Sequence, residues 1–156
     1  MRRPGTPTEL SEQQALAGIL DRMGLAWFHV PNEAKRSARE GASLKRAGLK
    51  PGVPDLVILD APPGYPLVRG MAIEMKRDGG SPSDVRPEQL AWLETFRKHG
   101  WIARVCYGKN HALKELAACG YPVPRGLVEM IEAAERPTPK TRVKPCRATT
   151  NQKRLG

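Results

Sequence analysis

Three charged side chains lie in two short apolar segments, and their types and spacing indicate a chemistry. Asp55 lies near the start of segment 54–59, and Glu74 and Lys76 alternate with apolar residues in segment 72–76. Successive side chains of a strand point to opposite faces, so Glu74 and Lys76 should share one face. Buried carboxylates need compensation, which a divalent cation commonly provides. The pattern predicts a hard-metal site with a lysine at its edge, as expected of a Mg²⁺-dependent phosphodiesterase.

The rest of the chain shows alternating helical and strand-like patterns that would position these residues. Ser11 is a candidate N-cap for the first helix, with Gln14 three residues later as in a capping box, and Gly24 ends this helix. We expect an α/β domain around a central mixed sheet. The expected elements are helix 11–23, strand 26–30, helix 35–47, strands 54–59 and 72–76, helix 87–99, strand 101–107, helix 112–118 and a further amphipathic turn or two at 127–134.

Length and charge set bounds on the class of protein. The 156 residues are enough for one domain with a core, and the formal charge of +10 favours a polyanionic partner. Seven of the 26 basic residues, and no acidic residue, lie in the tail 136–156. The body therefore carries 19 basic and 16 acidic side chains, a net charge of only +3. Net charge alone proves little about the body.

Membrane and secretory features are absent from the sequence pattern. No apolar run approaches the roughly 18 residues needed to span a bilayer, and no hydrophobic segment follows the first residues. The cysteines Cys106, Cys119 and Cys146 match neither a zinc spacing nor a disulfide framework. We expect no membrane association and a reducing, cytoplasmic setting in a bacterial or phage-infected cell.

Three motifs in order resemble the VRR-NUC family. They are Gly-Val-Pro-Asp-Leu at 52–56, Ile-Glu-Met-Lys at 73–76 and Glu-Gln-Leu-Ala-Trp at 88–92. The family comprises virus-type replication and repair nucleases of the PD-(D/E)xK, restriction-endonuclease-like superfamily. The resemblance also takes in 30–32 and 48–50, and it covers roughly residues 9 to 118.

The resemblance implies a restriction-endonuclease-like core, with a mixed sheet flanked by helices. We expect a nuclease domain at 9–120, a C-terminal helical extension at 121–135 and a basic, flexible, disordered tail at 136–156. The tail could add affinity for DNA that does not depend on sequence and falls with salt.

The resemblance also implies roles at the predicted site. Asp55 and Glu74 would bind Mg²⁺ or Mn²⁺ through carboxylate oxygens, with the backbone carbonyl of Met75 as a further ligand. Lys76 would orient or deprotonate the attacking water and stabilise negative charge at phosphorus. The products would carry a 5′-phosphate and a 3′-hydroxyl. Without a metal role, these residues would be solvated at strand ends or form a buried ion pair.

Two helices are expected to contribute further residues. Glu12 resembles an additional acid near the metal, although it could equally lie on a solvated helix face, and Glu9, about one turn earlier, is an alternative. Gln89 would point to the site, with Trp92 packed beneath it. Arg86 stands where the family often has serine, so this helix could begin instead at Ser83 or Asp84. Leu90, Leu93 and Phe96 should face inward.

Outside the metal site, one basic segment is the candidate for phosphate contacts, although a solvated charged helix is the competing interpretation. Its residues are Lys35, Arg36, Arg39, Lys45 and Arg46.

Taken with the resemblance, these features predict a metal-dependent DNA endonuclease that needs no other cofactor and cuts branched DNA, such as four-way (Holliday) junctions, as a homodimer. The apolar side of segment 127–134 could form the dimer interface or cap the core. The alternatives are a nicking or flap-type DNA nuclease, and a basic DNA-binding accessory protein without catalytic activity. Cleavage of junction, flap, nicked and linear substrates would separate these functions.

Overall fold

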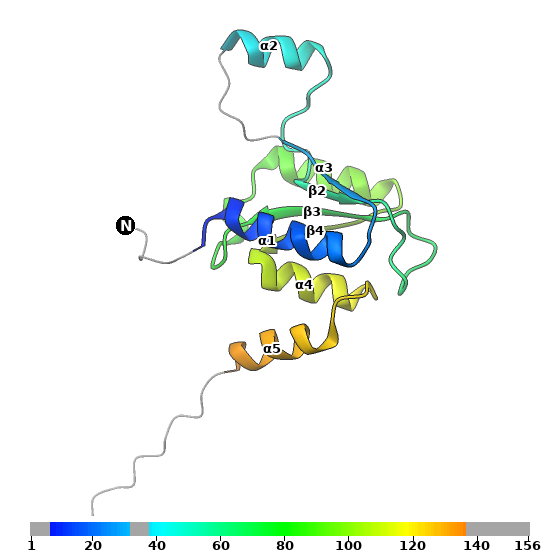
Figure 1. Cartoon of the computed structure of the whole chain (residues 1–156). Coiled ribbons are helices and arrows are strands. Elements are labelled where there is room, and N and C mark those ends of the chain that lie inside the picture. The colour runs from blue at the N-terminus through cyan, green and yellow to red at the C-terminus, as the bar shows by residue number, and fades with distance from the viewer. Residues whose placement is uncertain (1–6, 32–37, 137–156) are drawn as a thin grey trace, which may run out of the picture.

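The structure is a computed structural model that describes residues 7–31 and 38–136. It has the α/β architecture predicted from the sequence (Figure 1). The elements, in chain order, are α1 (Glu9–Arg22), β1 (Trp27–His29), α2 (Ala38–Arg46), β2 (Leu56–Ile58), β3 (Met71–Lys76), the 3₁₀ turn η1 (Pro82–Asp84), α3 (Pro87–Lys98), β4 (Ile102–Tyr107), α4 (Gly108–Ala118) and α5 (Arg125–Glu135).

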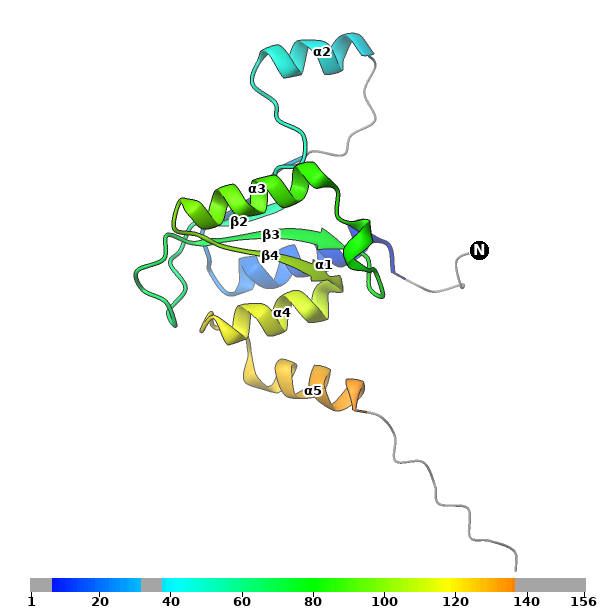
Figure 2. The ribbon, with the colours of Figure 1, turned by 180° about the vertical axis from the view of Figure 1, so that it is seen from behind.

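The four strands of the described residues form one mixed sheet, as expected, and their order in the sheet is β1-β2-β3-β4. The first two pairings are antiparallel, and β3 pairs with β4 in parallel. The parallel pair needs a crossover, which α3 provides on one face of the sheet, while α1 and α4 cover the other face (Figures 1 and 2). Helix α5 forms a further layer on α4. The central strands are therefore covered on both faces.

The two faces of β3 belong to different parts of the core. Met71, Ile73 and Met75 join the large apolar cluster that includes residues of α1 and α4. Ala72 belongs to a small cluster with Leu93 of α3 and a residue of β4. Since side chains alternate along a strand, Glu74 and Lys76 lie on the same side as Ala72, which is the side covered by α3.

The first helix begins one turn earlier than predicted. Thr8, and not Ser11, is its N-cap, because the Thr8 hydroxyl accepts a hydrogen bond from the backbone N–H of Ser11 at 3.1 Å. The Ser11 hydroxyl instead donates to the Thr8 carbonyl oxygen at 2.8 Å. The correction matters for function because it places Glu9 in the first turn of α1.

The prediction for the inward face of α3 is wrong at Leu90, which is 53% exposed. Leu93 is buried as expected, and Phe96 is half-buried. Gln89 takes the inward place that we assigned to Leu90, because the first turn of α3 faces the polar end of β3 rather than an apolar core. The hydrophobic pattern of the helix alone could not show that its first turn faces polar groups and not the apolar core.

The two peripheral helices differ in their packing. The residues of α2 whose side chains are described are exposed or half-buried, whereas α5 uses Ile131 and Leu127 to cover the large apolar cluster. Of the two uses that the sequence left open for the apolar side of α5, the structure shows the cap on the core. Within the described ranges, no helix is long and apolar enough to cross a membrane.

Candidate active site at the end of β3

The structure brings Asp55, Glu74 and Lys76 together. Asp55 lies one residue before β2, and its Oδ2 accepts a hydrogen bond from the backbone N–H of Met75 at 2.8 Å. Lys76 Nζ donates to Glu74 Oε1 at 2.7 Å. All three side chains belong to residues that are nearly inaccessible to solvent, with exposed fractions of 6% for Asp55, 1% for Glu74 and 6% for Lys76. The charged group is therefore part of the interior, fixed by strand pairing.

Gln89 joins this group from the first turn of α3. Its Nε2 donates to Glu74 Oε1, and its Oε1 accepts a hydrogen bond from the backbone N–H of Arg86 at 2.9 Å. The helix starts at Pro87, and the alternative starts lie in or at the end of the separate turn η1. Arg86 is thus the N-cap position, and the side chain of Gln89 caps it. The same amide fixes both the helix start and the Glu74 carboxylate.

The loop before Asp55 packs closely on this helix start. A Cβ atom on Gly52 would come within 2.9 Å of the Gln89 backbone nitrogen and 2.7 Å of the carbonyl carbon of Glu88. Gly52 also has a φ of +79°, which side chains disfavour. The glycine of the first motif therefore allows the Asp55 loop and α3 to approach each other.

The pKa values of Glu74 and Lys76 are both raised, for different reasons. Burial, reinforced by the charge of Asp55, raises the pKa of Glu74 to about 7, although Lys76 opposes the shift. Burial by itself would lower the pKa of Lys76, but its hydrogen bond to Glu74 and the charges of Glu74, Glu9 and Asp55 outweigh that effect, so its pKa is raised. Lys76 is therefore a cation at neutral pH, surrounded by more carboxylates than it can neutralise.

The residues present fit a hard divalent cation. Glu74 Oε2 is buried and has no hydrogen-bond partner among residues 7–31 and 38–136. An uncompensated buried carboxylate oxygen is costly, and a cation would satisfy it. The same part of the chain contains no group of three or more His, Cys, Asp or Glu side chains gathered as metal ligands. Asp55 and Glu74 would need a backbone carbonyl, water or substrate oxygens to complete a coordination shell.

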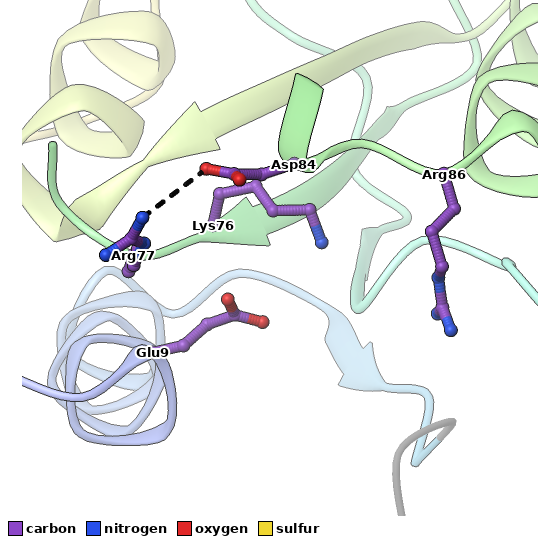
Figure 3. Close-up of a pocket in the computed structure, with 5 residues that line it drawn as sticks. All are labelled: Glu9, Lys76, Arg77, Asp84 and Arg86. Carbon is purple, nitrogen blue, oxygen red and sulfur yellow. Dashed lines mark ion pairs between the residues drawn. The ribbon is translucent and has the colours of Figure 1, made fainter. Parts of the chain in front are cut away.

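The two candidate acids of α1 point to different places. Glu9 lines a pocket of about 340 Å³ together with Lys76 and residues of the following turn (Figure 3). Glu12 is engaged elsewhere, because its Oε2 accepts a hydrogen bond from the backbone N–H of Lys109, in the first turn of α4, at 2.6 Å. Of the pair that the sequence left open, the geometry places Glu9 beside Lys76.

Two residues that the sequence did not assign to the site, His29 and Arg86, also lie beside it. His29 Nδ1 lies 2.8 Å from the backbone carbonyl oxygen of Asp55, which also accepts from the backbone N–H of Val30 at 2.8 Å. Arg86 lines the pocket that Lys76 borders (Figure 3). The pairing of β1 with β2 brings His29 to Asp55. For Arg86, the only sequence feature that could have indicated a role at the site is its residue type, an arginine directly before Pro-Glu-Gln.

The predicted DNA-binding segment is only partly described. Arg39, Lys45 and Arg46 are exposed in or at the end of α2, while Lys35 and Arg36 lie outside the described residues. Trp92 is half-buried, and it lines an apolar pocket of about 320 Å³ with Phe96 and Trp101. Its nearest described aromatic partner is Phe96, with ring centroids 6.4 Å apart.

Comparison with known proteins agrees with the motifs. The sequence model of the VRR-NUC domain matches residues 8–110. A solved structure described as a VRR_NUC domain protein is similar with a TM-score of 0.58 and 27% sequence identity, covering 74% of this chain and 88% of that chain. No curated protein is significantly similar. With motifs, fold and a match over most of the chain in agreement, the protein belongs to the VRR-NUC family of PD-(D/E)xK-like nucleases.

Proposed function

We propose that this protein is a metal-dependent DNA endonuclease that acts on branched DNA, with four-way junctions as its preferred substrate. One observation carries the proposal: Asp55, Glu74, Lys76 and Gln89 are hydrogen-bonded to one another or to the same strand in an otherwise apolar sheet. A fold has no structural need for four buried polar side chains at one strand end, whereas phosphodiester hydrolysis has a use for each of them.

The proposed ligands of Mg²⁺ or Mn²⁺ are the carboxylates of Asp55 and Glu74 and the carbonyl oxygen of Met75. The uncompensated Glu74 Oε2 supports this assignment. We assign the additional acid to Glu9 rather than Glu12, because Glu9 shares the pocket with Lys76. The bound cation would supply Lewis-acid stabilisation of negative charge on the phosphate and a lower pKa for coordinated water.

The remaining residues orient these groups and the substrate. Gln89 holds Glu74 Oε1, so that this carboxylate keeps one orientation. Lys76 donates to the same oxygen and is therefore a hydrogen-bond donor. This favours orientation of the water and stabilisation of charge at phosphorus over proton abstraction as its role. Exposed cations of α2 would contact phosphates away from the scissile bond.

A symmetry argument supports the proposed preference for four-way junctions. The described part of one chain carries one such site, and a two-fold junction would be cut symmetrically by two copies. Since Ile131 and Leu127 of α5 pack on the core of their own chain, the proposed homodimer would use another surface. A measurement of the oligomeric state of the full chain in solution should therefore accompany the cleavage assay.

The decisive experiment is cleavage of junction, flap, nicked and linear DNA with Mg²⁺, with Mn²⁺ and with a chelator. We expect metal-dependent cleavage that is fastest on the junction, and loss of cleavage but not of DNA binding in Glu74→Ala and Lys76→Ala. Glu132→Ala and Lys98→Ala, which change exposed residues of α5 and α3, are matched controls. Faster cleavage of flap or nicked DNA would favour that class of nuclease. Salt-sensitive binding without cleavage under every metal would indicate an accessory protein.

A further inference from the structure

We propose that His29, supported by Gln13 of α1, is a positioning residue that orients the proposed metal ligand Asp55. His29 Nδ1 lies 2.8 Å from the backbone carbonyl oxygen of Asp55, and Gln13 Nε2 lies 2.6 Å from the same Nδ1. The inference rests on the proposed function, because it takes the Asp55 carboxylate as a ligand of the cation. His29 and Gln13 lie outside the three motifs that resemble the family.

Asp55 depends on contacts with β1 because it lies just outside the pairing of β2 with β3. That pairing begins one residue later, at Leu56. The Asp55 side chain accepts a hydrogen bond from the backbone N–H of Met75 at 2.8 Å. Its carbonyl oxygen accepts from the backbone N–H of Val30 at 2.8 Å and contacts the His29 ring. Residues of β1 therefore hold the main chain of Asp55, while β3 holds its carboxylate.

The contact with Asp55 determines which ring nitrogen of His29 carries a hydrogen. A carbonyl oxygen can only accept, so Nδ1 must carry a hydrogen and donate it to Asp55. A nitrogen that donates in this way cannot also accept from Gln13. The Gln13 amide can instead turn by half a rotation and present its oxygen to the same N–H. Asp55 and Gln13 then share one donor, and the imidazole is held between α1 and the start of β2.

Gln13 connects this support to the helix that also carries the proposed additional acid. Glu9 and Gln13 are four residues apart, so they share one side of α1. Glu9 lines the pocket bordered by Lys76 (Figure 3). Gln13, one turn later, reaches His29. One face of α1 therefore contacts the proposed site at two points, and a shift of α1 would move both.

A second histidine makes the same kind of contact without a metal ligand. His99 Nδ1 lies 2.8 Å from the backbone carbonyl oxygen of Thr95, near the end of α3. It is ten residues from Gln89, which corresponds to about 15 Å along the helix. His29 and His99 are both exposed, so each buries little apolar surface. Loss of either ring should therefore affect folding to a similar extent, whereas only His29 should affect metal binding.

The experiment compares these two histidines. His29→Leu removes the donor, while His29→Asn retains one, because asparagine Nδ2 and histidine Nδ1 are both bonded to Cγ. His99→Leu is the matched control. Gln13→Ala is paired with Gln14→Ala, which changes the exposed next residue of α1. For each full-length protein, Mn²⁺ affinity without DNA is measured by electron paramagnetic resonance of the free ion. Melting temperature, DNA binding with a chelator, and kcat and KM at a fixed Mg²⁺ concentration are measured alongside.

For His29→Leu we expect Mn²⁺ binding weaker by about tenfold and a kcat lower by about tenfold or more, with the KM for DNA unchanged. DNA binding with a chelator should also remain. His29→Asn should recover most of the Mn²⁺ affinity and of kcat. Gln13→Ala should weaken Mn²⁺ binding by about threefold, and adding it to His29→Leu should have no further effect, because Gln13 acts through His29.

Mn²⁺ affinity and kcat in His29→Leu equal to those of His99→Leu would overturn the inference while leaving the nuclease proposal standing. A loss that His29→Asn does not recover would also overturn it, because the hydrogen bond would not be the cause. If His29→Leu does not fold, Gln13→Ala decides, and Mn²⁺ affinity equal to that of Gln14→Ala overturns the inference. His29-dependent Mn²⁺ binding without cleavage of any DNA would refute the nuclease proposal alone. Absence of Mn²⁺ binding by the wild-type protein would refute both.

Discussion

The six residues of β3 are divided between two faces that serve opposite purposes. On one face, Met71, Ile73 and Met75 enter the large apolar cluster with α1 and α4. On the other, Ala72 packs in a small cluster, and the strand then continues as Glu74 and Lys76. The first face supplies apolar burial, which stabilises the fold. The second face holds charged side chains. Their burial costs free energy, which the apolar burial on the first face can offset.

This contrast explains why α3 can approach a strand that carries charges. The buried residues of the small cluster on its side are Ala72, Leu93 and Ala103, with Phe96 and Val105 packed against them, so the sheet presents mainly small side chains to α3. Nearer the end of the strand, Gln89 replaces an apolar contact with hydrogen bonds to Glu74. The polar face is thereby ordered by specific hydrogen bonds, while the apolar face is ordered by packing.

The largest expected effect comes from the polar face. Glu74→Gln should lower the Mg²⁺-dependent cleavage rate by a factor on the order of 10³, because a charged ligand is lost while the shape is kept. DNA binding measured with a chelator should remain. Single-turnover cleavage of the preferred DNA is the measurement. Cleavage at a rate near that of the wild type would show that Glu74 has no role in the chemistry.

The apolar face should respond in stability. Ile73→Ala removes a fully buried side chain from the large cluster, and we expect the free energy of unfolding to fall by about 2–5 kcal/mol. The cleavage rate per folded molecule should change by no more than a few-fold, because Ile73 points away from the site. Chemical denaturation combined with cleavage at low temperature measures both. A specific loss of activity without a loss of stability would contradict the separation of the two faces.

The pH dependence of the free energy of unfolding should show how much it costs to bury the Glu74 carboxylate in its charged form. Glu74 holds its proton up to a pKa of about 7 in the metal-free folded protein, compared with an ordinary value of 4.5. Between these values the folded state binds more protons than the unfolded state, so the free energy of unfolding decreases as pH rises, by at most about 3 kcal/mol. Denaturant unfolding of the metal-free protein from pH 4 to pH 8 measures this slope.

Two comparisons sharpen that measurement. The Glu74→Gln variant has no ionisable group at this position. Its free energy of unfolding should therefore fall less over the same pH interval than that of the wild type. Saturating Mg²⁺ should also flatten the wild-type profile, because a bound cation displaces the proton. Identical slopes in the wild-type and variant proteins without metal would show that the pKa of Glu74 is not raised.

The smallest effect is expected where the sequence misplaced an apolar side chain. Leu90 is 53% exposed, so Leu90→Ser should change the free energy of unfolding by no more than about 0.5 kcal/mol. Leu93→Ser, at the buried position three residues later, is the contrasting variant and should destabilise severely. Thermal melts of the two variants suffice. Equal destabilisation would mean that both leucines face the core.

Much of the fold was predictable because it rests on local periodicity. The alternation of apolar residues in 72–76 placed Glu74 and Lys76 on one face, and their hydrogen bond agrees with that placement. Helix starts were less predictable, since Thr8 and Ser11 offer chemically equivalent hydroxyls and only the fold selects one of them. The inward position of Gln89 was suggested by the family resemblance, whereas the hydrophobic pattern favoured its neighbour Leu90.

The sequence by itself determined the types of element, their order, the family and the two carboxylates and lysine that share the end of the sheet. Only the tertiary structure decided that Glu9 rather than Glu12 lies beside Lys76, that α5 caps its own core and that Arg86 lines the pocket. The physical reason is that periodicity fixes which side chains share a face of one element. The neighbours of that face depend on how separate elements pack, and contacts between residues far apart in the chain set that packing.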